Sequence, residues 1–235
     1  MYVIRKEKNM FEYRFDTLLF DLDGTIVDSA PGVTKAFAYA LKKYGIDADP
    51  DDLKKVVGPP LLQSFVDFYG FSPEKATEAV EKYREYYRDR GIFECELYDG
   101  ISDLLSDLHK RGLKLLVASS KPTVFVKRIA EHFGIDYCFS HIVGAELDGR
   151  RTDKSEVVAE AIALSESDRE RILMVGDRSF DIVGGHNMGI KVAAVGWGYG
   201  SAEELAEADY VVTAPEEIIR LIGGESEAGT KRERI

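Results

Sequence analysis

The chain has 235 residues, of which 45% are hydrophobic and 31% charged, and its formal net charge is −11. This composition is typical of an ordinary soluble protein, and the negative charge argues against binding nucleic acid through a general basic surface. No apolar run approaches the ~18 residues of a membrane span and residues 1–10 lack the apolar core of a signal peptide, so we expect no membrane partner and a cytoplasmic location.

The first predicted element, after a charged extension at residues 1–10, is a strand at 17–22 with the sequence TLLFDL. Residues 31–97 then read as consecutive helices and contain no convincing strand. Ser72 followed by Pro73 is typical of a helix N-cap with proline at the first helical position. A block of helices directly after the first strand predicts a small cap-like domain inserted into a larger one.

From residue 98 onward, apolar runs of strand length alternate with helical patterns. The runs lie at 114–119, 172–177, 190–196 and 209–212, and the helical patterns at 101–112, 124–134, 154–164 and 180–189. Each run is apolar throughout, as expected for parallel strands covered on both faces. The sequence therefore predicts a doubly wound, Rossmann-like α/β sheet. We expect a discontinuous core at 11–30 and 98–222, an α-helical cap at 31–97, and flexible termini at 1–10 and 223–235.

Candidate catalytic residues follow the carboxyl ends of these strands, the edge at which open parallel sheets bind ligands. They are Asp21, Asp23, Ser119, Ser120, Lys121, Asp177 and Asp181, together with Lys154, which opens a later helix. Several carboxylates in one place could not ionise together without a cation. Oxygen ligands suit Mg²⁺, and serine and lysine beside such a site indicate phosphate.

Four motifs carry a resemblance to a known family. They are DLDGTIVDS, which begins at Asp21, then Ser119 at the end of an apolar run, Lys154, and GDRSFD at residues 176–181. In this order, and at these strand ends, they resemble the four motifs of the haloacid dehalogenase superfamily over nearly the whole core. The predicted helical insert lies where that superfamily places its α-helical cap.

The resemblance implies a role for each aspartate. Asp21 would attack phosphorus and form an aspartyl-phosphate. Asp23 would protonate the leaving alkoxide and then deprotonate the water that hydrolyses the intermediate. Mg²⁺ would be bound by Asp21, the backbone carbonyl of Asp23 and Asp177, with Asp181 orienting a metal-bound water or Lys154.

The resemblance also implies a phosphate site. Ser119, with Ser120 beside it, would contact the phosphate, and Lys154 would neutralise developing charge and keep Asp21 ionised. The N–H groups after Asp21 would cradle phosphate oxygens, helped by the flexible Gly24. The third motif departs from the family pattern in one respect, because no proline follows Lys154 in RTDKSEV. A surface position on a helix is therefore the alternative for this lysine.

Further segments narrow the resemblance. The helical cap, SSKP at 119–122, GDRSFDIVGG and WGYG together resemble the phosphoglycolate phosphatase-like group. Within that group, GPPLLQSF at 58–65 and ELDGRRTDK at 146–154 resemble a 5′-nucleotidase-like subset. The Gly58-Pro59-Pro60 segment is either a rigid interhelical turn or a loop that closes over the site and selects substrate, with Gln63 nearby. Lys121 is a candidate for contacting substrate away from the reacting phosphate.

The implied function is a Mg²⁺-dependent phosphatase for small phosphorylated metabolites, phosphoglycolate phosphatase-like, acting as a monomer or homodimer. A 5′-nucleotidase is the alternative, and a phosphoglucomutase-like transferase would keep all four motifs. A dehalogenase would lack the second carboxylate, Asp23. A non-enzymatic phospho-aspartate signalling module would need neither the cap nor an acid/base at Asp23, so both of these are disfavoured.

Overall fold

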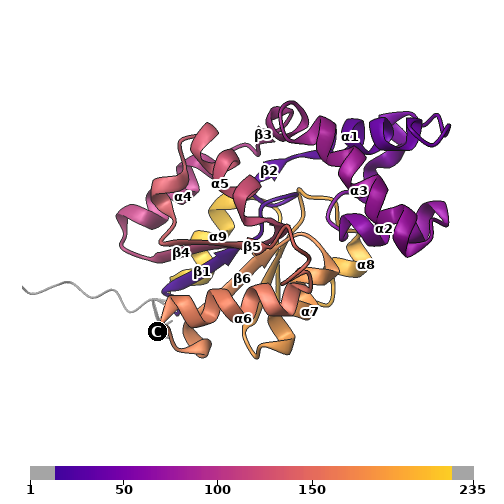
Figure 1. Cartoon of the computed structure of the whole chain (residues 1–235). Helices are drawn as coiled ribbons and strands as arrows, with labels where there is room; N and C mark the ends of the chain where they lie inside the picture. The colour runs from indigo at the N-terminus through magenta and orange to yellow at the C-terminus, as the bar shows by residue number, and fades with distance from the viewer. Residues whose placement is uncertain (1–13, 224–235) are drawn as a thin grey trace, which may run out of the picture.

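A parallel sheet forms the centre of the computed structural model, which describes residues 14–223 (Figure 1). The strand order is β5-β4-β1-β6-β7-β8, and all neighbouring strands are parallel. The strands are β1 (Thr17–Phe20), β4 (Lys114–Pro122), β5 (His141–Ala145), β6 (Ile172–Gly176), β7 (Lys191–Val195) and β8 (Tyr210–Val212). The predicted doubly wound α/β sheet is confirmed.

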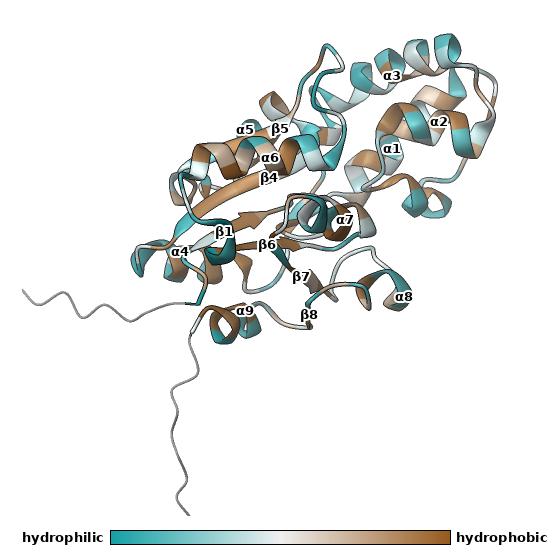
Figure 2. Cartoon of the chain, turned by 90° about the horizontal axis from the view of Figure 1, so that it is seen from below, coloured by the Kyte–Doolittle hydropathy of each residue, from teal (hydrophilic) through white to brown (hydrophobic). Residues whose placement is uncertain are grey.

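Helices cover both faces of the sheet, which explains why its central strands are apolar throughout (Figure 2). On one face, α6 and α7 pack against Leu19, Leu116 and Met174. On the other face, α4, α5 and α9 pack with Leu18 and Val117. The bounds are α4 (Ile101–Lys110), α5 (Thr123–His132), α6 (Lys154–Ser165), α7 (Ser179–Asn187), α8 (Ala202–Leu205) and α9 (Pro215–Ile222). Alternate residues of a strand thus enter opposite cores, and β1 is buried along its whole length.

The helices α1 (Ala30–Lys42), α2 (Leu61–Tyr69) and α3 (Pro73–Tyr87) gather at one end of the molecule (Figure 1). Phe37 of α1 and Phe65 of α2 stack with their ring centroids 4.1 Å apart. Ser72 caps α3, since its Oγ accepts the N–H of Lys75. Four 3-10 helices complete the described helices: η1 (Pro50–Val56), η2 (Gly91–Phe93), η3 (Asp136–Cys138) and η4 (Arg169–Arg171).

The two connections between this helical group and the sheet lie side by side. Strand β2 (Val27–Asp28) enters the helical group, β3 (Glu96–Leu97) leaves it, and the two pair antiparallel. The expectation that residues 31–97 contain no strand is therefore wrong at its last two residues. A two-residue strand has no periodicity from which it could be recognised.

Strand β5 is absent from the sequence-based prediction. It is short, it contains Gly144, and His141 at its start is exposed, so it lacks the continuous apolar run of the other strands. The terminal segments 1–10 and 223–235, predicted to be flexible, lie outside the described residues except for Gly223. None of the helices within residues 14–223 is long and apolar enough to span a membrane.

The strand order places a switch at β1 in the direction in which successive strands are added across the sheet. From β1 the chain proceeds to β4 and β5 on one side, then crosses to β6, β7 and β8 on the other. The carboxyl ends of β1, β4 and β6 therefore meet at one edge of the sheet, at the switch point where such folds bind ligands. Those three ends lead to Asp21, Ser119 and Asp177.

Candidate active site

The candidate site begins where β1 ends. Asp21 directly follows β1, and its backbone N–H donates to the carbonyl of Val175 on β6 at 2.9 Å. This bond continues the sheet ladder by one residue and fixes the direction of the Asp21 side chain. The residue is 7% exposed, so the carboxyl group is held against the sheet edge rather than in solvent.

Lys154, the first residue of α6, links two of the predicted carboxylates. Its Nζ lies 2.8 Å from Asp21 Oδ1 and 2.7 Å from Asp181 Oδ1, and its side chain is only 5% exposed. A buried ammonium is retained only with such partners, because an unpaired buried charge is costly. The alternative of a surface lysine at this position is not what the structure shows.

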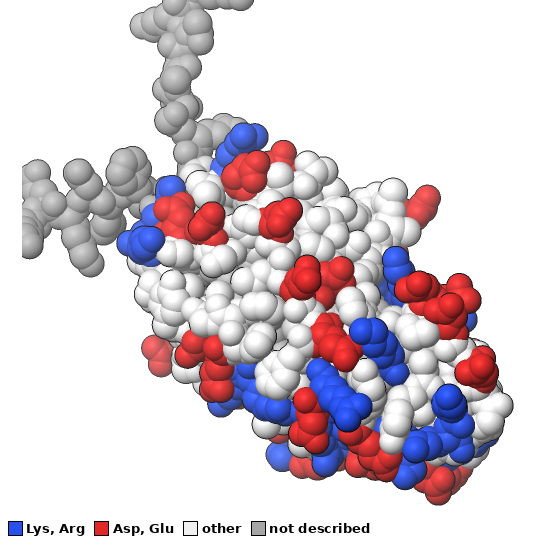
Figure 3. All heavy atoms as spheres, turned by 90° about the horizontal axis from the view of Figure 1, so that it is seen from above, with Lys and Arg blue, Asp and Glu red and all other residues white. Residues whose placement is uncertain are grey.

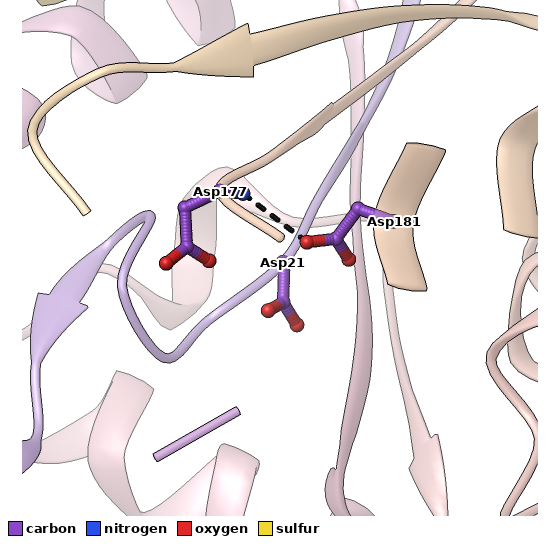
Figure 4. Close-up of side chains that lie close together, drawn as sticks. All are labelled: Asp21, Asp177 and Asp181. Carbon is purple, nitrogen blue, oxygen red and sulfur yellow. Dashed lines mark hydrogen bonds between the residues drawn. The ribbon is translucent and has the colours of Figure 1, made fainter. Parts of the chain in front are cut away.

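Asp177 and Asp181 complete a group of three carboxylates with Asp21 (Figure 4). Ligand-capable oxygens of the three lie within 4.8 Å of one another. Asp181 Oδ2 accepts the backbone N–H groups of Asp177 and Arg178, each at 3.1 Å, so both Asp181 oxygens are engaged. By contrast, the buried Asp177 Oδ1 has no hydrogen-bond partner among the described residues.

Burial and crowding of negative charge change the acidity of these groups. Burial raises the pKa of Asp21 to about 6, although the Lys154 ammonium opposes the shift. Burial, followed by the charges of Asp181 and Asp21, raises the pKa of Asp177 well above its usual value. Burial alone would lower the pKa of Lys154, but Asp181 and Asp21 outweigh it and the pKa rises. When all three carboxyls are ionised, the cluster therefore carries more negative charge than the Lys154 ammonium can balance.

The turn after Asp21 has a geometry that only glycine fits. Gly24 has a φ of +82°, and a Cβ there would lie 2.1 Å from Asp177 Oδ2. Its N–H donates to the carbonyl of Val27 at 2.9 Å. That amide is therefore engaged in this conformation, and Gly24 lets the turn approach Asp177. The expected phosphate cradle of N–H groups after Asp21 stays a prediction.

Asp23, the second aspartate of the motif, forms an ion pair with a different lysine. The Asp23 carboxylate pairs with Lys121, whose side chain is 6% exposed and whose Nζ also lies 5.2 Å from the centre of the Tyr87 ring. Ser119 Oγ accepts the N–H of Lys121 at 3.3 Å. Lys121 thus positions Asp23, a contact that sequence reasoning missed when it assigned this lysine to substrate alone.

A cavity of about 420 Å³ lies over the two motif aspartates. It brings together the predicted residues Asp21, Asp23, Ser119, Ser120, Lys121, Gly58 and Pro59. Gln63 is not part of it: its Nε2 donates to Asp67 at 2.6 Å, and it borders a separate cavity of about 1130 Å³. Pro59 and Pro60 border both cavities, so Gln63 does lie near the loop, and its expected part in substrate selection stays a prediction.

Two residues that connect the site to the helical group were not predicted as site residues. The Tyr199 N–H donates to Asp177 Oδ2 at 2.7 Å, and its hydroxyl donates to Asp28 Oδ1 at 2.6 Å. Arg178 donates through Nη1 to the Val57 carbonyl at 2.9 Å and through Nε and Nη2 to Glu204. The one sequence signal for these contacts is the glycine of the WGYG segment. A Cβ on Gly198 would lie 2.4 Å from the Asp177 Cβ, so glycine is needed for this segment to lie against Asp177.

Comparison with known proteins agrees with this geometry. The family model described as haloacid dehalogenase-like hydrolase matches residues 18–195. A 5′-nucleotidase from Pseudomonas aeruginosa is 45% identical over 82% of this chain and 87% of its own length. The tyrosine-protein kinase PtkA of Mycobacterium tuberculosis is 43% identical over 79% of this chain, and the match spans 64% of that protein.

Among solved structures, a predicted phosphatase from Clostridium acetobutylicum aligns with a TM-score of 0.85 and 42% identity, covering 88% of this chain and 97% of that one. The family match includes β1, the helical group, and the strands that carry Ser119 and Asp177. On this match and these relatives, the chain belongs to the haloacid dehalogenase-like hydrolase family.

Proposed function

We propose that the chain is a Mg²⁺-dependent phosphatase that hydrolyses small phosphomonoesters through an aspartyl-phosphate at Asp21. The observation that carries the proposal is the position of Asp21. Its carboxylate lies at the floor of a ligand-sized cavity, paired with Lys154 and adjacent to the unpartnered oxygen of Asp177. A buried carboxylate held in this way is a suitable nucleophile.

The carboxylate cluster fits a divalent cation. Asp177 Oδ1 is buried without a partner, and oxygen ligands are those that Mg²⁺ prefers. Asp21 and Asp177 would hold the ion, whereas Asp181 has both oxygens engaged and is suited to positioning Lys154. When bound, the ion would offset repulsion between the carboxylates and an anionic phosphate.

The protein's own residues account for the bonds made and broken. An Asp21 oxygen attacks phosphorus as the ester P–O bond breaks, and Asp23 gives its proton to the leaving alkoxide. Asp23 then takes a proton from water, which attacks the phosphorus of the acyl phosphate and frees inorganic phosphate and Asp21. Lys121 positions Asp23 for both transfers, because its Nζ contacts Asp23 Oδ1, as an ion pair when Asp23 is ionised.

The helical group forms the other half of the site. Residues 31–97 supply the Gly58 to Pro60 loop and the walls contributed by α1, α2 and α3. We propose that they form a cap on a catalytic core at 11–30 and 98–222, of which the structure describes residues 14–30 and 98–222. We propose that the two parts move about the paired strands β2 and β3, opening to admit substrate and closing to exclude water. Arg178, bonded to the Val57 carbonyl, stabilises the closed arrangement.

The charges and the relatives support a small phosphorylated substrate. On the face shown in Figure 3, acidic and basic side chains are interspersed and form no continuous basic surface for nucleic acid. The Pseudomonas relative is named for nucleoside phosphate hydrolysis, which supports ester cleavage. A second candidate, transfer of a phosphoryl group to a tyrosine hydroxyl, is supported by the name of the mycobacterial relative.

The test is a phosphate-release assay with p-nitrophenyl phosphate and Mg²⁺, with and without EDTA. We expect release that EDTA abolishes, and we expect the Asp23→Asn variant to accumulate a phosphorylated form. Acid-quenched intact mass spectrometry would detect one added phosphoryl group, which the Asp21→Asn, Asp23→Asn double variant must lack. Phosphate release undiminished in Asp21→Asn would contradict the mechanism. Labelling of a tyrosine peptide from ATP, without phosphate release from esters, would favour the second candidate.

A further inference from the structure

The cavity over Asp21 and Asp23 has charged side chains at its floor and mainly apolar side chains on one wall. Its volume of about 420 Å³ is within the range of small-molecule sites. Resting on the proposed function, we propose that the substrate's leaving group carries an uncharged planar ring that lies against the helical group. A substrate with a second anionic group, such as a carboxylate or a further phosphate, is disfavoured by the same surface.

One wall of the cavity is apolar and aromatic. It is formed by Val33, Val56, Leu61, Leu62, Val80, Tyr83, Tyr87 and Phe125. The Tyr83 and Tyr87 rings stack with centroids 5.1 Å apart, and the Phe125 ring meets Tyr87 edge-on at 5.5 Å. A planar ring on the leaving group would extend this aromatic cluster, because aromatic rings gain from offset or edge contact beyond the area they bury.

The charges around the cavity oppose a second anion. Of the residues that line it in the described part of the chain, Lys121 and Arg84 are the cations, and each is already paired, with Asp23 and Glu81 respectively. The carboxylates that line it are Asp21, Asp23, Glu81, Glu146 and Asp148. An anionic group entering here would lose its hydration without gaining a free cation, which is unfavourable.

The proposal is tested with four phosphomonoesters that separate ring from charge while keeping an alkoxide leaving group. Benzyl phosphate has a ring and no further charge, and 4-carboxybenzyl phosphate has both. Glycerol 3-phosphate has neither, and phosphoglycolate has charge without a ring. We expect benzyl phosphate to exceed phosphoglycolate in kcat/KM by at least about tenfold, with 4-carboxybenzyl phosphate falling below benzyl phosphate. Uridine 5′-monophosphate, run alongside, tells whether a nucleobase or a simple arene is the better ring.

Helix α2 provides a matched pair of variants. Leu62 and Phe68 are both 40% exposed, but Leu62 lines this cavity and Phe68 lines the separate one. Leu62→Lys places a cation on the apolar wall and should shift the ratio of kcat/KM for phosphoglycolate over benzyl phosphate upward by about tenfold. Phe68→Lys adds the same charge to the same helix and should leave that ratio unchanged.

Each outcome decides between the two proposals. Phosphoglycolate hydrolysed as well as benzyl phosphate, or an equal shift in both lysine variants, would overturn the ring proposal while leaving the phosphatase intact. No hydrolysis of any of the five esters by the Mg²⁺-loaded wild type would instead contradict the proposed function. A loss of folding in Leu62→Lys is recognised by circular dichroism, and Leu62→Gln, expected to lower kcat/KM for benzyl phosphate selectively, then replaces it.

Discussion

The sheet edge and the helical group face the same cavity with opposite chemistry. At the edge, charged groups are paired at fixed positions, as with Lys154, which lies within 2.8 Å of both Asp21 and Asp181. On the side of α2 and α3, apolar residues predominate, including the half-exposed Leu62, and the charged pair is Arg84 with Glu81. Under the proposed function, we assign bond-making to the edge and substrate selection to the helices. Changes at the edge should therefore abolish turnover, and changes in the helices should reorder substrates.

The largest expected effect is at the nucleophile. Asp21→Asn should lower kcat by about 10⁴-fold or more, since an amide cannot form the acyl phosphate. Steady-state kinetics with p-nitrophenyl phosphate measures it. Asp16→Asn is the control, because Asp16 lies before the other end of β1 and pairs with Arg171. Equal losses in both variants would point to a folding defect instead of a catalytic one.

The stability of the folded protein should depend on pH through the carboxyl group of Asp21. The native pKa of Asp21 is about 6, above its ordinary value of 3.8, so between these values the native state binds the proton that the unfolded state has lost. In metal-free protein, this group's contribution to stability should therefore fall by about 2 kcal/mol as pH rises from 4 to 6.

Urea unfolding in EDTA across that window measures the dependence. The Asp21→Asn variant should gain stability relative to wild type as pH rises, because it lacks the titrating group. A constant difference between the two proteins from pH 4 to 6 would show that Asp21 keeps an ordinary acidity.

Substitution of Asp177 should increase the stability of the metal-free protein and remove the stabilisation by Mg²⁺. Its Oδ1 is buried without a partner, so Asp177→Asn should stabilise the metal-free protein by about 2 kcal/mol. The amide oxygen can still accept the Tyr199 N–H. Adding Mg²⁺ should raise the Tm of wild type and leave that of the variant unchanged. A Tm that rises with Mg²⁺ in the variant as much as in wild type would contradict a role for Asp177 in holding the ion.

The smallest expected effect lies at the contact between the two regions. Arg178→Gln removes the charged donor to the Val57 carbonyl, so closure should weaken and kcat/KM should fall by about tenfold. Arg169→Gln, which alters an exposed arginine bonded to the Met188 carbonyl, is the control. A reduced kcat/KM in both variants to the same extent would argue against a specific closing role for Arg178.

The sequence was informative where one residue type satisfies one physical requirement. The apolar runs predicted five of the six sheet strands because burial on both faces demands them, and the aspartates could be placed at strand ends. Tyr199 and Arg178 could not be assigned, since a tyrosine amide or an arginine side chain meeting a distant backbone carbonyl leaves no pattern in the chain. The pairing of Lys121 with Asp23 likewise depends on tertiary packing alone.

Gly24 has a consequence for how the protein tolerates change. Its positive φ and its closeness to Asp177 exclude a side chain for two independent reasons, one in the backbone and one in space. In a saturation library, no single second-site change could rescue a substitution at this position. Relieving the clash at Asp177 would leave the strained turn, and relaxing the turn would leave the clash. Position 24 should therefore tolerate no substitution in a selection for activity, although it contributes no reacting atom.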